Sequence, residues 1–247
     1  HVRDSIDLKR SMIFVVIALL PCLLFGIYNT GYQSNLLYDP NYAQNPLLTN
    51  ILNNIWVGLI TVLPIYIVTY SVGGLCEAVF SIVRKHEINE GFLVTGMLIP
   101  LTLPPDIPLW MVGVATVFGI VIGKEIFGGT GFNVFNPALV ARAFLFFAYP
   151  AYMSGDKAWV VKPTSYYPQG DVDYITQATP LGDLANTAYD GTSPYVSELT
   201  GYTWSEMFLG FVPGSIGETS TLCVLIGALF LIMTGIGSWR TMIGCVF

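Results

Sequence analysis

One acidic residue lies inside an otherwise uncharged apolar run, which makes it the first candidate for chemistry. Glu77 is the only charged residue in Ile55–Val83. A charge at the centre of a membrane helix costs about 2.5–3.5 kcal/mol, so such an acid is treated as functional by default. It follows Gly73-Gly74 by one helical turn, and these residues can share a helix face. The alternatives are a snorkelling acid, or one that pairs with Arg84 or Lys85.

A second candidate is a cluster of small and polar residues in the longest hydrophilic stretch. Asp173, Thr176, Ala178 and Thr179 precede Pro180. Proline disfavours helix at the residue before it, and Asp and Thr suit helix caps. The residues alone therefore indicate a turn or a loop cap.

A glycine-rich stretch interrupts two apolar runs and offers two amides. Gly128-Gly129-Thr130-Gly131 is followed by Asn133 and Asn136. Glycines let the backbone approach a ligand, which predicts a broken-helix wall with the amides as polar contacts. Close packing of membrane helices is the equal alternative. The dinucleotide fingerprint G-x-G-x-x-G is absent.

A lone arginine is the fourth candidate. Arg142 lies inside the apolar run Ala138–Tyr149. Unpaired charges are avoided at membrane depth, so we expect a buried acid or a ligand as its partner. Glu125 is the nearest acid in the sequence, and Glu218 is expected to be a favourable charge at a helix N-terminus.

The composition indicates the environment of these groups. Of 247 residues, 53% are hydrophobic and 11% are charged, against about a quarter charged in a typical globular protein. The net charge of −6 excludes a nucleic-acid partner, because phosphate binding needs clustered cations. The cysteines and histidines show no metal-ligand spacing. We therefore expect an all-α, polytopic integral membrane protein in contact with membrane lipid.

Apolar runs predict the spans. We expect full spans at Met12–Tyr28, Ile55–Val83, Ile107–Gly123 and Thr219–Gly237, and broken or re-entrant helices at Gly91–Leu103 and Ala138–Tyr149. A continuous helix over Ile55–Val83 would be about 44 Å long, so it must tilt, protrude or break at Gly73-Gly74. The sequence reads as part of a longer chain.

The basic residues predict the orientation. Lys and Arg flank the spans at ends that can all be cytoplasmic, whereas Gly31–Asn54 has neither and Ala151–Met207 is mainly acidic. These two stretches are expected on the outer face. Three regions follow: membrane helices over 1–150, an outer-face loop over 151–207, and a helix with the start of another over 208–247.

Several segments together resemble one family. Asp173, Thr176, Ala178 and Thr179 match the pattern D-x-x-[ST]-x-A-T, at which a flavin transferase attaches FMN to threonine through a phosphoester. The chain resembles the B subunit of the bacterial sodium-translocating NADH:quinone oxidoreductase, and the D subunit of the Rnf ferredoxin:NAD oxidoreductase is related. The other segments that carry the resemblance are Val83–Phe92, Lys124–Gly131, Asn136–Leu139, Arg142–Pro150 and Pro213–Glu218.

The resemblance implies covalent FMN on Thr179 at the periplasmic side of the bacterial inner membrane. It also implies electron transfer from the C subunit through this flavin to riboflavin and ubiquinone, coupled to outward sodium transport with subunits A, C, D, E and F. Glu77 would then lie on the sodium path. Riboflavin or quinone would contact Gly128, Gly129, Asn133, Asn136 and Arg142, and Gly73 and Gly74 would flank quinone. The alternatives are an Rnf-type D subunit and a solute channel or transporter without a redox role.

Overall fold

The computed structural model describes residues 8–38, 42, 47–85, 91–154, 159–161, 179–187 and 201–246. All regular structure in these ranges is helical. Three apolar helical stretches are long enough to cross a membrane: Lys9–Leu37, Asn50–Arg84 and Leu109–Phe127. The expected all-α, multi-pass membrane fold is confirmed. The predicted loop region 151–207 lies largely outside the described residues, as do Asp173, Thr176 and Ala178.

The first two helices are longer than predicted. Helix α1 covers Leu8–Tyr38 and α2 covers Leu47–Arg84, so both helices extend beyond the predicted spans into the polar stretch Gly31–Asn54. Several of the described polar residues there are buried, and some hydrogen-bond with one another. Asn35 Nδ2 donates to Asn54 Oδ1 at 2.7 Å, and both side chains are fully buried.

Helix α2 continues through Gly73-Gly74, so the alternative of a break at this pair does not occur. Its 38 residues span about 57 Å, far more than a hydrocarbon core of about 30 Å. The helix therefore protrudes from the membrane. Gly73 allows close packing: a Cβ built on it would lie 2.5 Å from Phe92 Cε2 and 2.8 Å from Ile120 Cδ1.

Three apolar helices are too short to cross alone: α3 (Gly91–Leu101), α5 (Pro137–Ala148) and α10 (Thr221–Met233). The first two were expected to be short. Thr219–Gly237 was expected to be a full span, and that prediction is wrong. Helix α10 has 13 residues, about 20 Å, and begins only after the chain has descended into the bundle.

The end of α3 meets the segment that leads into α10. Gly217 N donates to Leu101 O at 2.8 Å, and Ile216 N donates to Leu103 O at 3.1 Å. A Cβ built on Gly26 of α1 would lie 1.9 Å from Ile216 O, so the segment touches α1 near the middle of its apolar stretch. Irregular backbone at this depth is tolerated because protein surrounds it.

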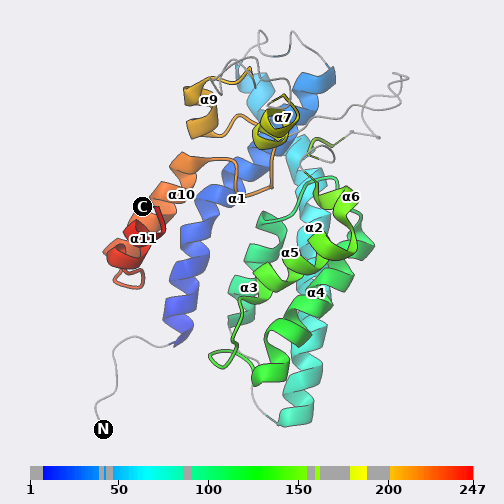
Figure 1. Cartoon of the computed structure of the whole chain (residues 1–247), viewed down its shortest axis with the longest axis vertical. Coiled ribbons are helices and arrows are strands. Elements are labelled where there is room, and N and C mark those ends of the chain that lie inside the picture. The colour runs from blue at the N-terminus through cyan, green and yellow to red at the C-terminus, as the bar shows by residue number, and fades with distance from the viewer. Residues whose placement is uncertain are drawn as a thin grey trace.

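Figure 1 shows the remaining arrangement. Helix α4 (Leu109–Gly123) packs between α2 and α5, α10 lies along α1, and α11 (Trp239–Val246) follows α10. The start of α1, the end of α2 and the α4–α5 connection share the lower end, whereas α7 (Pro180–Thr187) and α9 (Trp204–Leu209) lie at the upper end. The helix ends that carry the basic residues therefore lie at the opposite end of the bundle from α7, which begins directly after Thr179.

Candidate functional site

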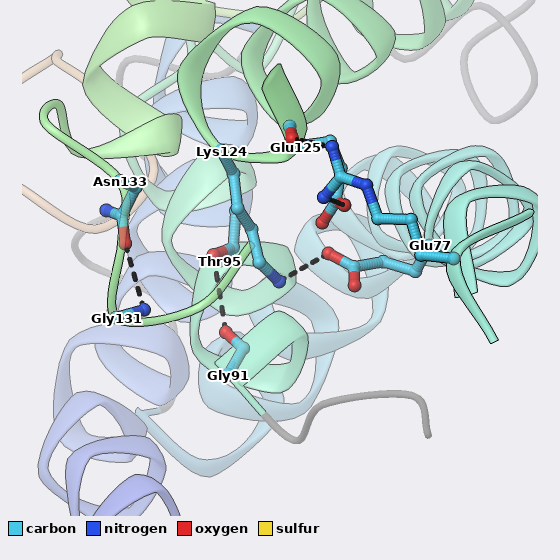
Figure 2. Close-up of polar contacts among 8 residues, drawn as sticks. Glu77, Gly91, Thr95, Lys124, Glu125, Gly131 and Asn133 are labelled. Carbon is cyan, nitrogen blue, oxygen red and sulfur yellow. Dashed lines mark hydrogen bonds and ion pairs between the residues drawn. The ribbon is translucent and has the colours of Figure 1, made fainter. Parts of the chain in front are cut away.

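A buried ion pair joins α2 to the end of α4. Lys124 Nζ donates to Glu77 Oε1 at 2.5 Å, and the side chains are 3% and 4% exposed. Figure 2 shows the ammonium reaching across to the carboxylate. Because burying a charge without a partner is costly, the pair explains how both groups are tolerated. Neither Arg84 nor Lys85, the expected alternatives, is the partner of Glu77.

Glu125, the residue after Lys124, forms a second ion pair with α2, and in this pair α2 supplies the cation. Arg84 Nη1 donates to Glu125 Oε2 at 3.2 Å, and Arg84 Nη2 donates to the backbone carbonyl of Glu125. Glu125 is 1% exposed. Glu77 and Arg84 are two turns apart on α2, so two consecutive residues after α4 contact two positions on one helix face. The four charges sum to zero.

The glycines after this cluster form a reversal. The 3₁₀ turn η2 (Glu125–Phe127) is followed by Gly128, Gly129 and Gly131, whose φ angles are 120°, 94° and 92°. Such positive φ values strain any residue with a Cβ. Gly129 N donates to Lys124 O at 3.2 Å. The stretch turns the chain back toward α5 and holds Lys124 and Glu125 against α2, so the alternative of helix packing does not describe it.

The two asparagines stabilise the same loop. Asn133 Oδ1 accepts from Gly131 N at 3.3 Å, as Figure 2 shows, and its Nδ2 donates to Phe135 O at 2.8 Å. Asn136 caps α5 by accepting from Ala138 N at 2.9 Å. The structure thus gives each amide a local role, and the expected role in ligand contact remains a proposal.

Arg142 pairs with Glu218, and the expected partner Glu125 is wrong. Arg142 Nη1 lies 2.8 Å from both carboxylate oxygens of Glu218. Sequence distance misled here, because η2 directs Glu125 toward α2 while the segment before α10 enters the bundle beside α5. Glu218 is therefore an ion-pair partner in addition to being a charge before a helix.

An apolar cavity of about 580 Å³ adjoins the glycine-rich loop. It lies between α4, α5 and the loop, and its walls are almost entirely hydrocarbon. The lining includes Phe118, Phe127, Phe135, Phe144 and Phe147. A planar aromatic or isoprenoid group would suit such walls.

Thr179 lies at the start of α7, at the opposite end of the bundle from Lys124. Its Oγ1 accepts from Gly182 N at 3.1 Å, as the hydroxyl of a helix N-cap does. The residue is partly exposed. Figure 1 places α7 toward the upper end of the bundle.

Lys124 is a site residue that was not predicted from the sequence. In the sequence, Lys124 is simply the basic residue that follows the apolar run Ile107–Gly123. The signal that could have found it is the need of Glu77 for a cation at membrane depth. In the part of the chain that the structure describes, no group of three His, Cys, Asp or Glu side chains is arranged to hold a metal ion. Glu77, the acid expected on the sodium path, is paired with Lys124.

Comparisons with known proteins give the chain its relatives. The sequence profile of the NQR2, RnfD, RnfE family matches residues 1–247. A protein of Azotobacter vinelandii, named as the B subunit of Na(+)-translocating NADH-quinone reductase, is 50% identical over 99% of the chain, which covers 61% of that relative. Proteins of the same name from Chromohalobacter salexigens and Pseudomonas aeruginosa are 46% and 45% identical over 99% of the chain, which covers 59% and 61% of them. The chain thus spans about three fifths of the length of these relatives.

Proposed function

Because the chain belongs to the NQR2, RnfD, RnfE family, we propose that it is a membrane subunit of a bacterial sodium-translocating NADH:quinone reductase. The observation that carries the proposal is 45–50% identity, over 99% of the chain, to proteins with that name. Its partners are then the other subunits A, C, D, E and F, with ubiquinone and sodium as substrates. The activity is that of the whole complex.

We further propose that Thr179 holds FMN through a phosphoester. The hydroxyl is partly exposed at the start of α7, and Gly182 N–H points at it. A helix N-terminus favours negative charge, so a phosphate on this oxygen is electrostatically compatible with its surroundings. The preceding Asp173, Thr176 and Ala178 complete the motif in the sequence. When bound, FMN would supply the electron-transfer chemistry, and the chain supplies its anchor and position.

A second cofactor position is proposed at the glycine-rich loop. The apolar, aromatic cavity beside the loop supports riboflavin or a quinone there. Gly128 and Gly129 would allow close backbone approach, with Asn133 and Asn136 as polar contacts of the same loop. Arg142 lies on α5, which contributes a wall of this cavity.

The proposed orientation puts α7 on the periplasmic side of the inner membrane. Arg10, Arg84 and Lys124 all belong to elements that meet at the lower end of the bundle, opposite α7. Basic residues favour the cytoplasmic side. This distribution supports an outer-face flavin.

In-gel flavin fluorescence tests the flavin proposal. The full-length protein, co-expressed with the flavin transferase, is expected to fluoresce after denaturation in SDS. Thr179→Val should be dark. Thr203→Val is the matched control, because Thr203 also caps a helix at the upper end by accepting from a backbone amide, that of Glu206. It should fluoresce like the wild type, whereas a dark wild-type band would favour a transporter without a redox role.

The Rnf alternative needs a different measurement, because that family shares the flavinylation pattern. NADH-driven ubiquinone reduction by the purified complex supports the quinone reductase. Reduction of NAD by ferredoxin would instead support the Rnf-type D subunit.

A further inference from the structure

We propose that Lys124 is a resident counter-cation of Glu77 that a sodium ion must displace before it binds the carboxylate. The inference rests on the proposed function, in which sodium is a substrate, and on the expectation that Glu77 lies on the sodium path. The inference adds Lys124 to the cation path and makes its ammonium a competitor of sodium for the Glu77 carboxylate. The carboxylate is then closed to sodium in the state that the structure describes.

The geometry of the pair supports this role. The ammonium lies 2.5 Å from Glu77 Oε1, in the position that a bound monovalent cation would take, and both side chains are almost fully buried. A cation that binds this oxygen in that position must take the place of the ammonium. Binding therefore becomes an exchange of one cation for another.

The charges explain why the exchange would depend on electron transfer. The Glu77–Lys124 pair is neutral, and so is the neighbouring Arg84–Glu125 pair. Adding sodium while Lys124 stays protonated leaves a net charge of +1 in a medium of low dielectric constant, which is unfavourable. An electron delivered nearby offsets that charge. Such an electron would come from the riboflavin or quinone proposed beside the glycine-rich loop, which begins three residues after Glu125.

The attachment of Lys124 allows its ammonium to move while the backbone stays in place. The backbone of the next residue is fixed, because Arg84 contacts both the side chain and the carbonyl of Glu125. Lys124 itself reaches Glu77 through a flexible four-carbon stem. The ammonium can therefore leave the carboxylate by side-chain rotation without unfolding the end of α4.

The experiment measures equilibrium binding of ²²Na⁺ to the oxidised, assembled complex, with potassium keeping the ionic strength constant. The variants are Lys124→Gln, Lys124→Arg and the double variant Lys124→Gln/Glu77→Gln. Removing the internal competitor should tighten sodium binding in Lys124→Gln by about tenfold or more. Lys124→Arg keeps the cation and should bind like the wild type. The double variant should not show the tighter sodium binding of Lys124→Gln, because it lacks the Glu77 carboxylate.

Lys85→Gln is the matched control, because Lys85 is an exposed lysine at the end of α2. It should bind sodium like the wild type. In parallel, the sodium concentration that half-saturates quinone reduction should fall in Lys124→Gln. A wild-type complex whose quinone reduction ignores sodium would instead refute the proposed function.

Unchanged sodium binding in Lys124→Gln, with sodium-stimulated activity in the wild type, would overturn the inference alone. If Lys124→Gln fails to assemble in potassium, the inference requires that sodium restore assembly, because sodium would replace the missing cation. Failure in both salts would show that the pair is only structural and would also overturn it.

Discussion

Gly58 of α2 lies directly against the main chain of Ile27 in α1. A Cβ built on Gly58 would lie 1.8 Å from the carbonyl oxygen of Ile27. The contact is reciprocal, since a Cβ on Gly31 of α1 would lie 1.9 Å from Asn54 O of α2. Small residues permit such backbone contact between membrane helices. This crossing fixes the two longest helices, and α2 in turn carries Glu77.

Gly58→Ala should therefore destabilise the fold strongly. The new methyl group meets a rigid carbonyl, so the helices must separate, at a cost of about 3 kcal/mol, the upper end of the usual range for overpacking. Gly113→Ala is the control, because a Cβ there would be 3.8 Å from its nearest neighbours. The thermal unfolding temperature of the purified protein should be lowered only in Gly58→Ala, and equal effects of the two changes would contradict the described crossing.

The neighbouring glycines of α2 should respond differently to the same change. A Cβ at Gly73 would lie 2.5 Å from Phe92, whereas one at Gly74 would be 3.8 Å from it. Gly73→Ala should cost about 1–3 kcal/mol of stability. Gly74→Ala should be neutral or stabilising by up to about 1 kcal/mol, because alanine favours helix. Melting temperatures of the two variants test this prediction. A lower melting temperature for Gly74→Ala than for Gly73→Ala would contradict the packing of Gly73 against Phe92.

The Arg142–Glu218 pair should show a measurable coupling. The side chains are 34% and 48% exposed in the isolated chain, so water screening limits the coupling to about 1 kcal/mol or less. Arg142→Gln and Glu218→Gln should each lower stability, and the double variant should lose less than the sum. Thermal unfolding of all four proteins gives the coupling. Strict additivity would mean that the two groups do not interact.

The N-terminus of α9 predicts a pH effect. Hydrogen bonds from the backbone amide and hydroxyl of Thr203 hold the pKa of Glu206 below its ordinary value of 4.5. A lowered pKa stabilises the fold above the ordinary value, and this contribution is lost as the pH falls through the folded pKa. Thr203→Ala should cost about 0.5–2 kcal/mol near neutral pH. The difference in stability between the wild type and Thr203→Ala, measured by thermal unfolding, should become smaller below the ordinary pKa of 4.5. A difference that stays constant with pH would contradict the linkage.

Several parts of this fold could be predicted from the sequence because one local property determines them. Gly91–Leu103 and Ala138–Tyr149 are too short to cross a membrane, and they form α3 and α5. The glycine-rich stretch was expected to be irregular, and its positive φ angles explain why. Glu77 was singled out because a charge inside an apolar membrane helix is costly and is treated as functional by default.

Other features depend on contacts that local patterns do not encode. Gly31–Asn54 was left outside the predicted spans because its residues are polar, yet Asn35 and Asn54 in it are buried against each other between α1 and α2. The partners of Glu77 and Arg142 are 47 and 76 residues away in the sequence. The η2 reversal and the segment before α10 bring them together. The short α10 likewise follows from the backbone contact of Gly217 with Leu101 at depth.

The mass of the peptide that contains Thr179, taken from the native assembled complex, tests the central proposal most directly. We expect an increase equal to FMN joined with loss of water, located on Thr179 by fragmentation and absent from Thr179→Val. An unmodified Thr179 peptide from an active complex would contradict the proposed role as a flavin carrier.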